Sequence, residues 1–183
     1  MRVVAGAARG RRLVTPEGDR TRPTSDRVRE AIFNALWSRG LIDGARVLDL
    51  FAGSGALGIE ALSRGASHAT FVDSDRRARR AIAANLAACG FVERADVIGT
   101  TVERFLDERR HRPGRVGEAP HYDLALCDPP YAYDAWDSLL TRLPATFVVV
   151  ESGGPVPPPR GWSLVRESRY GDTWVGFLSR SAT

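Results

Sequence analysis

Residues 47–65 hold the feature that most restricts the fold: a predicted strand, a tight turn and a helix. The stretch 47–58 (VLDLFAGSGALG) runs from apolar residues into Gly53, Gly55 and Gly58, which are spaced G-x-G-x-x-G. Glycine lets the backbone turn sharply and lie close to a ligand, and the unpaired N–H groups at a helix start favour electron-rich oxygens. This stretch therefore predicts a nucleotide-binding site.

Two acidic residues indicate the charge of the ligand. The glycine spacing fits the dinucleotide fingerprint, and Asp73, at the end of the next apolar run, stands where a ribose-binding acid is expected. Asp49, however, places a negative charge beside the glycine turn, where it would repel a pyrophosphate. A cationic cofactor is favoured instead, and S-adenosylmethionine carries an ammonium, a sulfonium and a ribose diol. The glycine spacing alone would also fit an ordinary strand-turn-helix with a charged loop.

The composition is that of one soluble globular domain. The chain has 183 residues, of which 43% are hydrophobic and 26% charged. It has no apolar run long enough to span a bilayer, and residues 1–6 lack a signal-peptide hydrophobic region, so we expect a cytoplasmic protein. Cys89 and Cys127 lack metal-ligand spacing, so we expect reduced core cysteines and no metal site.

Arginine supplies all 26 basic residues, and the formal net charge is +4. Near the start of the chain, two short strands at 2–5 and 11–14 are predicted to form a β-hairpin. The charges of this hairpin suit either an edge strand that deters aggregation or an arm that binds phosphates. The further arginines that follow in the sequence favour the phosphate-binding arm. We expect residues 1–21 to form this basic extension and residues 22–183 the main domain. The candidate contacts to a nucleic-acid backbone are Arg9, Arg11, Arg12, Arg22, Thr24 and Arg27.

Helices and strands alternate through the rest of the chain at the spacing of a doubly wound parallel sheet. A first helix is predicted from Asp26, where an apolar stripe with helical spacing follows from Val28. Later strands are predicted at 69–72, 95–98 and 122–127, helices at 76–88 and 102–110, and an exposed loop at 109–120. Ligands of such sheets lie beyond the carboxyl ends of the strands. The side chains predicted at these ends are Asp49, Asp73, Thr100, Thr101 and Asp128.

A second motif, Asp128-Pro129-Pro130-Tyr131, follows the predicted strand 122–127. Two consecutive prolines cannot extend a parallel sheet, and they fix the backbone beyond it. An exocyclic amine of a nucleobase is a poor nucleophile because its lone pair is delocalised, so an enzyme that methylates it must hold the NH2 group with acceptors. Asp128 and a carbonyl held by Pro129 could be these acceptors, and Tyr131 offers a stacking face. In isolation, the motif would also fit a proline-rich turn beside an acid.

With both motifs in place, the chain resembles the class I S-adenosylmethionine-dependent methyltransferases. It is similar, more narrowly, to the bacterial enzymes that methylate N2 of guanine 966 in the 16S rRNA of the small ribosomal subunit. The glycine turn and the Asp-Pro-Pro-Tyr motif are shared by many amino-methyltransferases, and the Arg-Pro-Thr entry to the first helix is more specific. The matching segments are 2–6, 9–11, 22–24, 26–31, 33–34, 48–58, 60–66, 128–131 and 170–173.

The resemblance implies a Rossmann-like α/β fold with a seven-stranded, mostly parallel sheet. Its last strands, an antiparallel hairpin, would be drawn from 146–151, 163–168 and 173–179, with Gly171 and Asp172 at the turn. The cofactor would be S-adenosylmethionine, which leaves as S-adenosylhomocysteine. Its methionine end would be held by Asp49, Phe51, Ala52, Gly53 and Gly55, its ribose by Asp73, and its adenine by Thr101 and Val102.

The resemblance also implies the substrate and its binding residues. The target guanine would lie against Asp128, Pro129, Pro130 and Tyr131, and the Arg and Thr side chains of the first 27 residues would contact the RNA. The expected partner is 16S rRNA within an assembled or assembling small subunit, bound by a monomer without a membrane or a metal ion. The loop 109–120 is longer and richer in Arg and Pro than the family pattern.

Three other functions are compatible with parts of the sequence. A DNA adenine-N6 methyltransferase shares the Asp-Pro-Pro-Tyr motif, but the residues after Tyr131 that could form a target-recognition region are used by the sheet. A nicotinamide dehydrogenase would explain the glycines but not Asp49 or Asp128. A non-enzymatic RNA-binding assembly factor could retain a dormant cofactor pocket, and the intact Asp128 argues against dormancy.

Overall fold

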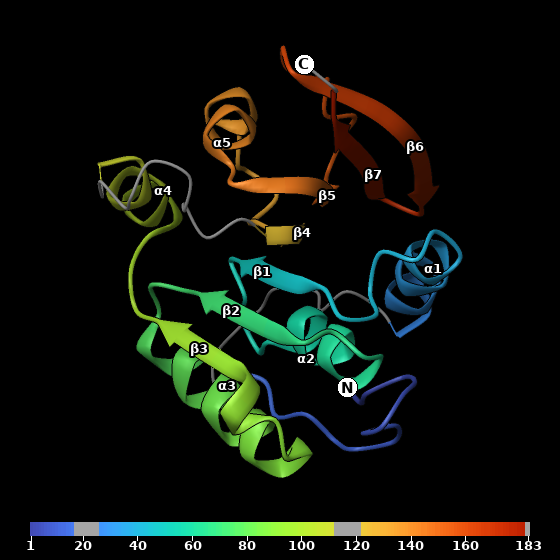
Figure 1. Cartoon of the computed structure of the whole chain (residues 1–183), viewed down its shortest axis with the longest axis vertical. Helices are drawn as coiled ribbons and strands as arrows, with labels where there is room; N and C mark the ends of the chain where they lie inside the picture. The colour runs from blue at the N-terminus through green and yellow to red at the C-terminus, as the bar shows by residue number, and fades with distance from the viewer. Residues whose placement is uncertain (17–25, 112–121, 182–183) are drawn as a thin grey trace.

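A seven-stranded sheet forms the centre of the structure, a computed structural model that describes residues 1–16, 26–111 and 122–181, without the side chains of 109–111 (Figure 1). The strand order is β3-β2-β1-β4-β5-β7-β6. Strands β1 to β5 pair in parallel, and β7 runs antiparallel between β5 and β6. This confirms the predicted sheet and its C-terminal hairpin. The strands are β1 (Arg46–Leu50), β2 (His68–Val72), β3 (Ala95–Ile98), β4 (Tyr122–Cys127), β5 (Ala145–Ser152), β6 (Trp162–Tyr170) and β7 (Thr173–Arg180).

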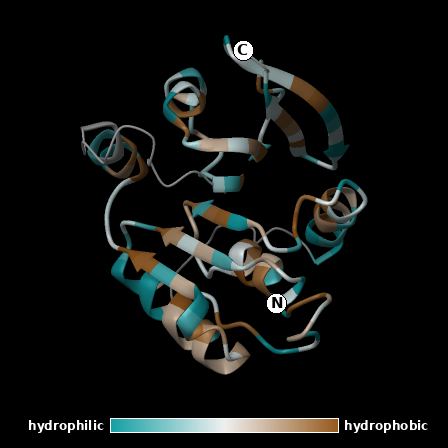
Figure 2. Ribbon diagram, viewed as in Figure 1, coloured by the Kyte–Doolittle hydropathy of each residue, from teal (hydrophilic) through white to brown (hydrophobic). Residues whose placement is uncertain are grey.

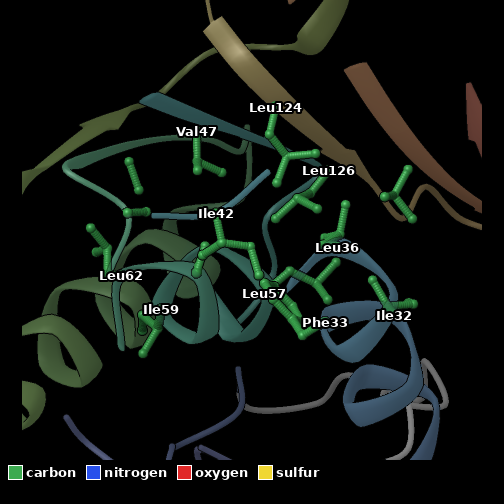
Figure 3. Close-up of a cluster of buried hydrophobic side chains, with 14 of the residues drawn as sticks. Ile32, Phe33, Leu36, Ile42, Val47, Leu57, Ile59, Leu62, Leu124 and Leu126 are labelled. Carbon is green, nitrogen blue, oxygen red and sulfur yellow. The ribbon is translucent and has the colours of Figure 1, made fainter. Parts of the chain in front are cut away.

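Helices cover both faces of the sheet because successive residues of a buried strand point to opposite sides. In β1, Val47 packs in one core cluster with residues of α1, α2 and α3, whereas Leu48 packs in another with residues of α4 and α5. Figure 3 shows part of the first cluster, in which Phe33 of α1 and Leu57 of α2 lie on the same side of the sheet as Leu124 of β4. The helices are α1 (Asp26–Trp37), α2 (Ala56–Ser63), α3 (Arg76–Cys89), α4 (Val102–His111) and α5 (Trp136–Arg142), with a 3-10 turn at Val92–Arg94.

Two of these elements, α5 and the 3-10 turn, are absent from the sequence predictions. Helix α5 has only seven residues, and Ala135 at its N-cap makes no side-chain capping bond, so its sequence carries little helix-start signal. The amphipathic α3 is much clearer, with hydrophilic residues along one side (Figure 2). Gly90, with a φ of 74°, ends it in the left-handed conformation.

The N-terminal arm, residues 1–16, runs forward and back as predicted, but its ladder is limited to one bridge between Arg2 and Arg12. Val3 and Leu13 still donate across the arm, to the carbonyls of Arg11 and Met1 at 3.0 and 3.1 Å. The ladder does not extend to residues 4 and 5, because their amides pair elsewhere. Val4 and Ala5 donate their backbone N–H groups to the Glu60 carboxylate of α2 instead of to the opposite arm.

Other expectations meet mixed outcomes. Both cysteines are free, and Cys127 is buried as predicted, but Cys89 is only partly buried. Within the described ranges, no helix is both long and apolar enough to cross a bilayer. The predicted contacts Arg22 and Thr24 lie outside the described residues, as does most of the 109–120 loop.

Candidate active site

A large cavity opens at the carboxyl ends of the parallel strands, where the doubly wound topology predicts a ligand. Its volume is about 1240 Å³, and segments from many parts of the chain line it. The lining contains every predicted cofactor and catalytic residue except Gly55: Asp49, Phe51, Ala52, Gly53, Asp73, Thr101, Val102, Asp128, Pro129, Pro130 and Tyr131. The tertiary structure therefore brings the two sequence motifs to one site.

The glycine turn is held in left-handed backbone conformations. Gly53 and Gly55 have φ angles of +54° and +76°, and Phe51 has a φ of 58° although it carries a side chain. A bulky residue in this region is strained, and such strain is found where the surrounding structure fixes a functional loop. Here the Asp73 carboxylate fixes the loop, because its Oδ2 accepts the Gly53 N–H at 2.8 Å.

Asp49 lies at the floor of the turn and is 1% exposed. Its Oδ2 accepts the backbone N–H of Gly58 at 2.9 Å. Burial raises the pKa of Asp49 well above its usual range; the Gly58 bond opposes this rise, and the nearby Asp128 and Asp73 add to it. A buried carboxylate facing two others favours a cationic ligand, because a positive charge would compensate all three. The ammonium and sulfonium groups of S-adenosylmethionine fit this requirement.

Asp73 has a structural role as well as the predicted ligand role. Besides holding Gly53, its Oδ1 accepts the N–H of Asp75 at 2.8 Å. An ionised carboxylate has about four lone-pair sites, so both oxygens can still accept a hydroxyl proton from a ribose. At the next strand end, Thr101 is exposed and Val102 is buried, and together they form a wall of the cavity.

The Asp-Pro-Pro-Tyr turn starts directly after β4 and has the predicted position beside the glycine turn. Tyr131 is 59% exposed, and two neighbours define the place of its ring. Its Oη lies 3.3 Å from the Thr173 Oγ1, and the missing side chain of Gly153 leaves room for the ring, because a Cβ there would lie 3.3 Å from Tyr131 Cδ1. A flat aromatic face is therefore presented at the cavity, as stacking on a base requires.

Among the lining residues that sequence reasoning missed are Glu151 and Tyr133. Glu151 is the penultimate residue of the hydrophobic β5 and is 3% exposed. Cys127 and Val150 are register partners, so Glu151 neighbours Asp128 across the sheet. The strand-end rule that selected Asp49 could have found it. Tyr133 packs edge-on against Phe51, and burial, followed by the charge of Glu103, raises its pKa to about 12.

The predicted RNA contacts lie apart from this cavity. Arg9, Arg11 and Arg12 are exposed on the N-terminal arm, and Arg27 is exposed on α1. None of these four described side chains lines the cavity. Their role as phosphate contacts stays a prediction.

Comparisons with known proteins give a consistent result. A family described as Conserved hypothetical protein 95 matches residues 1–179. YlbH of Bacillus subtilis (strain 168), whose name assigns it provisionally to the rRNA methyltransferases, is 41% identical over 98% of this chain and 99% of the relative. Ribosomal RNA small subunit methyltransferase D of Escherichia coli (strain K12) is 34% identical over 100% of this chain and 91% of the relative. Among solved structures, Escherichia coli yhhF, described provisionally as a methyltransferase, has a TM-score of 0.83 at 34% identity and covers 100% of this chain and 99% of its own.

Proposed function

The chain belongs to the family described as Conserved hypothetical protein 95, and on that premise we propose that it transfers a methyl group from S-adenosylmethionine to the exocyclic N2 amine of a guanine in 16S rRNA. The names of two relatives, at 41% and 34% identity, support rRNA methylation. The guanine 966 type of target and the small-subunit context rest on the sequence resemblance. The observation that carries the proposal is the rigid Asp128–Tyr131 turn in the same cavity as the glycine turn.

The turn supplies what an amine of a base needs to become a nucleophile. Asp128 and the carbonyl held by Pro129 accept the two amine protons and so align the nitrogen lone pair, while Tyr131 stacks on the ring. The nitrogen becomes cationic as its new bond to carbon forms, and it then releases a proton easily. Asp128 therefore acts chiefly by position, and it does not have to be a strong base.

A second carboxylate favours guanine over adenine as the target. Guanine presents two neighbouring donors, N1–H and the N2 amine, whereas adenine presents its N6 amine beside an N1 acceptor. Asp128 directly follows β4, Glu151 lies near the end of the adjacent β5, and both line the same cavity, so the cavity presents two carboxylates to the two donors. An adenine N1 lone pair facing a carboxylate would be repelled, which lowers the affinity for adenine.

The cofactor end of the cavity has a distinct set of residues. When bound, S-adenosylmethionine supplies an electrophilic methyl group on a positively charged sulfur. Asp49 and the turn from Phe51 to Gly55 would hold its methionine end, Asp73 its ribose hydroxyls, and Thr101 and Val102 its adenine. When ionised, the buried Asp49 carboxylate would also repel anionic ligands at this end, which argues against a pyrophosphate-containing nucleotide.

The proposal is tested by offering labelled S-adenosylmethionine with naked 16S rRNA, undermethylated small subunits and duplex DNA, and identifying the modified nucleoside by mass. We expect N2-methylguanosine in one or both rRNA substrates. N6-methyladenine in DNA would overturn the proposal in favour of a DNA methyltransferase. Cofactor binding without transfer to any acceptor would favour a non-enzymatic RNA-binding protein.

Asp128→Ala separates chemistry from cofactor binding. The variant should lose methyl transfer, because the amine loses an acceptor, and should bind S-adenosylhomocysteine nearly as well as the wild type. Asp134→Ala is the matched control, since Asp134 is an exposed carboxylate of the same loop and does not line the cavity. Equal activity in Asp128→Ala and Asp134→Ala would contradict the role of Asp128.

A further inference from the structure

The N-terminal arm is fastened to helix α2, which begins at the glycine turn, by buried side chains. Glu60 is fully buried and accepts the N–H groups of Val4 and Ala5 at 2.7 and 3.0 Å. One turn further along α2, the Ser63 hydroxyl accepts the N–H of Ala8 at 2.9 Å and donates to the carbonyl of Ala5 at 2.6 Å. Figure 1 shows the arm, in dark blue, beside α2 and α3. The arm is therefore packed on the core.

Asn85, on α3, joins the arm directly to the glycine turn. Its side chain is 1% exposed, and its Oδ1 accepts the N–H of Val14 at 2.8 Å. Its Nδ2 donates one proton to the Val14 carbonyl and the other to the Ser54 carbonyl, both at 2.9 Å. Both donors of one buried amide are thus used to connect two segments that lie 40 residues apart in the sequence.

Both connected segments also reach the cavity. Thr15 and Pro16, directly after Val14, line it together with Gly53 and Ser54. In the other direction along the chain, the exposed Arg11 and Arg12 precede Val14 by two or three residues. Asn85 itself is buried and does not line the cavity.

We propose that Asn85 is a positioning residue that couples RNA binding by the N-terminal arm to cofactor binding at the glycine turn. RNA bound to the arm would also restrict the position of Val14. Because Asn85 is hydrogen-bonded to both Val14 and the Ser54 carbonyl, it would restrict the position of the glycine turn as well. By linkage, the cofactor must then raise the affinity for RNA by the same factor as RNA raises the affinity for the cofactor. The inference rests on the proposed function for the identity of the RNA.

The test measures binding rather than turnover. The affinity of the full chain for S-adenosylhomocysteine is measured by calorimetry with and without saturating 16S rRNA, and the affinity for the RNA with and without S-adenosylhomocysteine. In the wild type we expect each ligand to tighten the other by a common factor of about 5 to 150, the usual range of such coupling. In Asn85→Ala we expect this factor to fall to about one, because the connection is removed.

Two further variants separate coupling from stability. Asn34→Ala is the control, since its side chain is exposed and accepts a bond from Arg64, which belongs to neither the arm nor the turn. Its coupling factor should equal that of the wild type. Val14→Pro removes the N–H that Asn85 accepts, at an exposed position of the arm, and leaves α3 intact. It should lower the coupling factor even if Asn85→Ala fails to fold.

The outcomes distinguish the two proposals. If the wild type binds 16S rRNA but the coupling factor is one, or if the factor survives in both Asn85→Ala and Val14→Pro, the inference is wrong and the proposed function stands. If Asn85→Ala only lowers the melting temperature, Asn85 is merely structural. If the wild type neither binds nor methylates 16S rRNA, the proposed function fails.

Discussion

Gly58→Ala tests whether the third glycine of the motif is required by packing inside the protein. Gly58 lies in helix α2, where its φ is ordinary, so alanine would be favoured by helix propensity by about 1 kcal/mol. A Cβ at this position, however, would lie 2.3 Å from Cε1 and 2.7 Å from Cζ of Phe71, and 3.0 Å from Oδ2 of Asp49. The helix and β2 are therefore too close for any side chain.

The clash outweighs the helix propensity. The Phe71 ring is fully buried in a close-packed core, so it cannot move without displacing its neighbours. Overpacking of this kind costs about 1 to 3 kcal/mol, and contacts this short correspond to the upper end. Subtracting the gain in propensity, we expect a net loss of about 2 kcal/mol, or a melting temperature lower by about 4 to 8 °C for a domain of this size.

Urea unfolding of the cofactor-free protein measures the loss. Phe71→Leu removes the ring edge that the new Cβ would meet, so a double-mutant cycle with Gly58→Ala should show a favourable coupling of about 1 kcal/mol or more. Gly90→Ala is the control for an unhindered glycine, since no atom lies within 4 Å of its Cβ position and only its φ of +74° is unfavourable. A Gly58→Ala protein as stable as the wild type, or an additive cycle, would refute the packing argument.

Two more perturbations have defined outcomes. Asp49→Asn should stabilise the cofactor-free protein increasingly as the pH rises. Because the pKa of Asp49 is raised in the folded protein, its contribution to stability is full below the ordinary pKa of 3.8 and is lost as the pH rises through the raised pKa. Urea midpoints over a pH series would measure this, and a pH-independent difference would contradict it. Replacing Arg9, Arg11 and Arg12 with Ala should flatten the salt dependence of RNA binding by up to about one log-log unit per lost phosphate contact; an unchanged slope would make the arm's charges irrelevant to binding.

Most of the fold could be predicted from local sequence signals. The helix predicted at 76–88 is observed as Arg76–Cys89, and the strand predicted at 69–72 as His68–Val72, because hydrophobic periodicity and glycine stops are properties of short segments. The site was predictable for a related reason. Asp49 and Asp128 were selected because each follows or ends a buried strand, and parallel topology brings such ends together.

The polar interior was not predictable in this way. Arg29, Glu60 and Asn85 are of residue types usually found at the surface, yet all three are buried on the core-facing sides of their helices. Their burial depends on partners from distant parts of the chain: Arg29 pairs with Asp26 and Glu60, and it donates to the Arg2 carbonyl. Helical spacing places Arg29 and Asn85 on the core-facing sides, but no local pattern records which distant groups will satisfy them.

The sequence by itself determined the elements, their order and the two motifs at the strand ends, because these follow from the chemistry of neighbouring residues. Only the tertiary structure decided that Val4 and Ala5 of the N-terminal arm pair with Glu60, and that Asn85 connects Val14 to the glycine turn. The physical reason is that a buried hydrogen-bonding group must be satisfied, and its partner can lie anywhere the fold places one: Val14 and Asn85 are 71 residues apart.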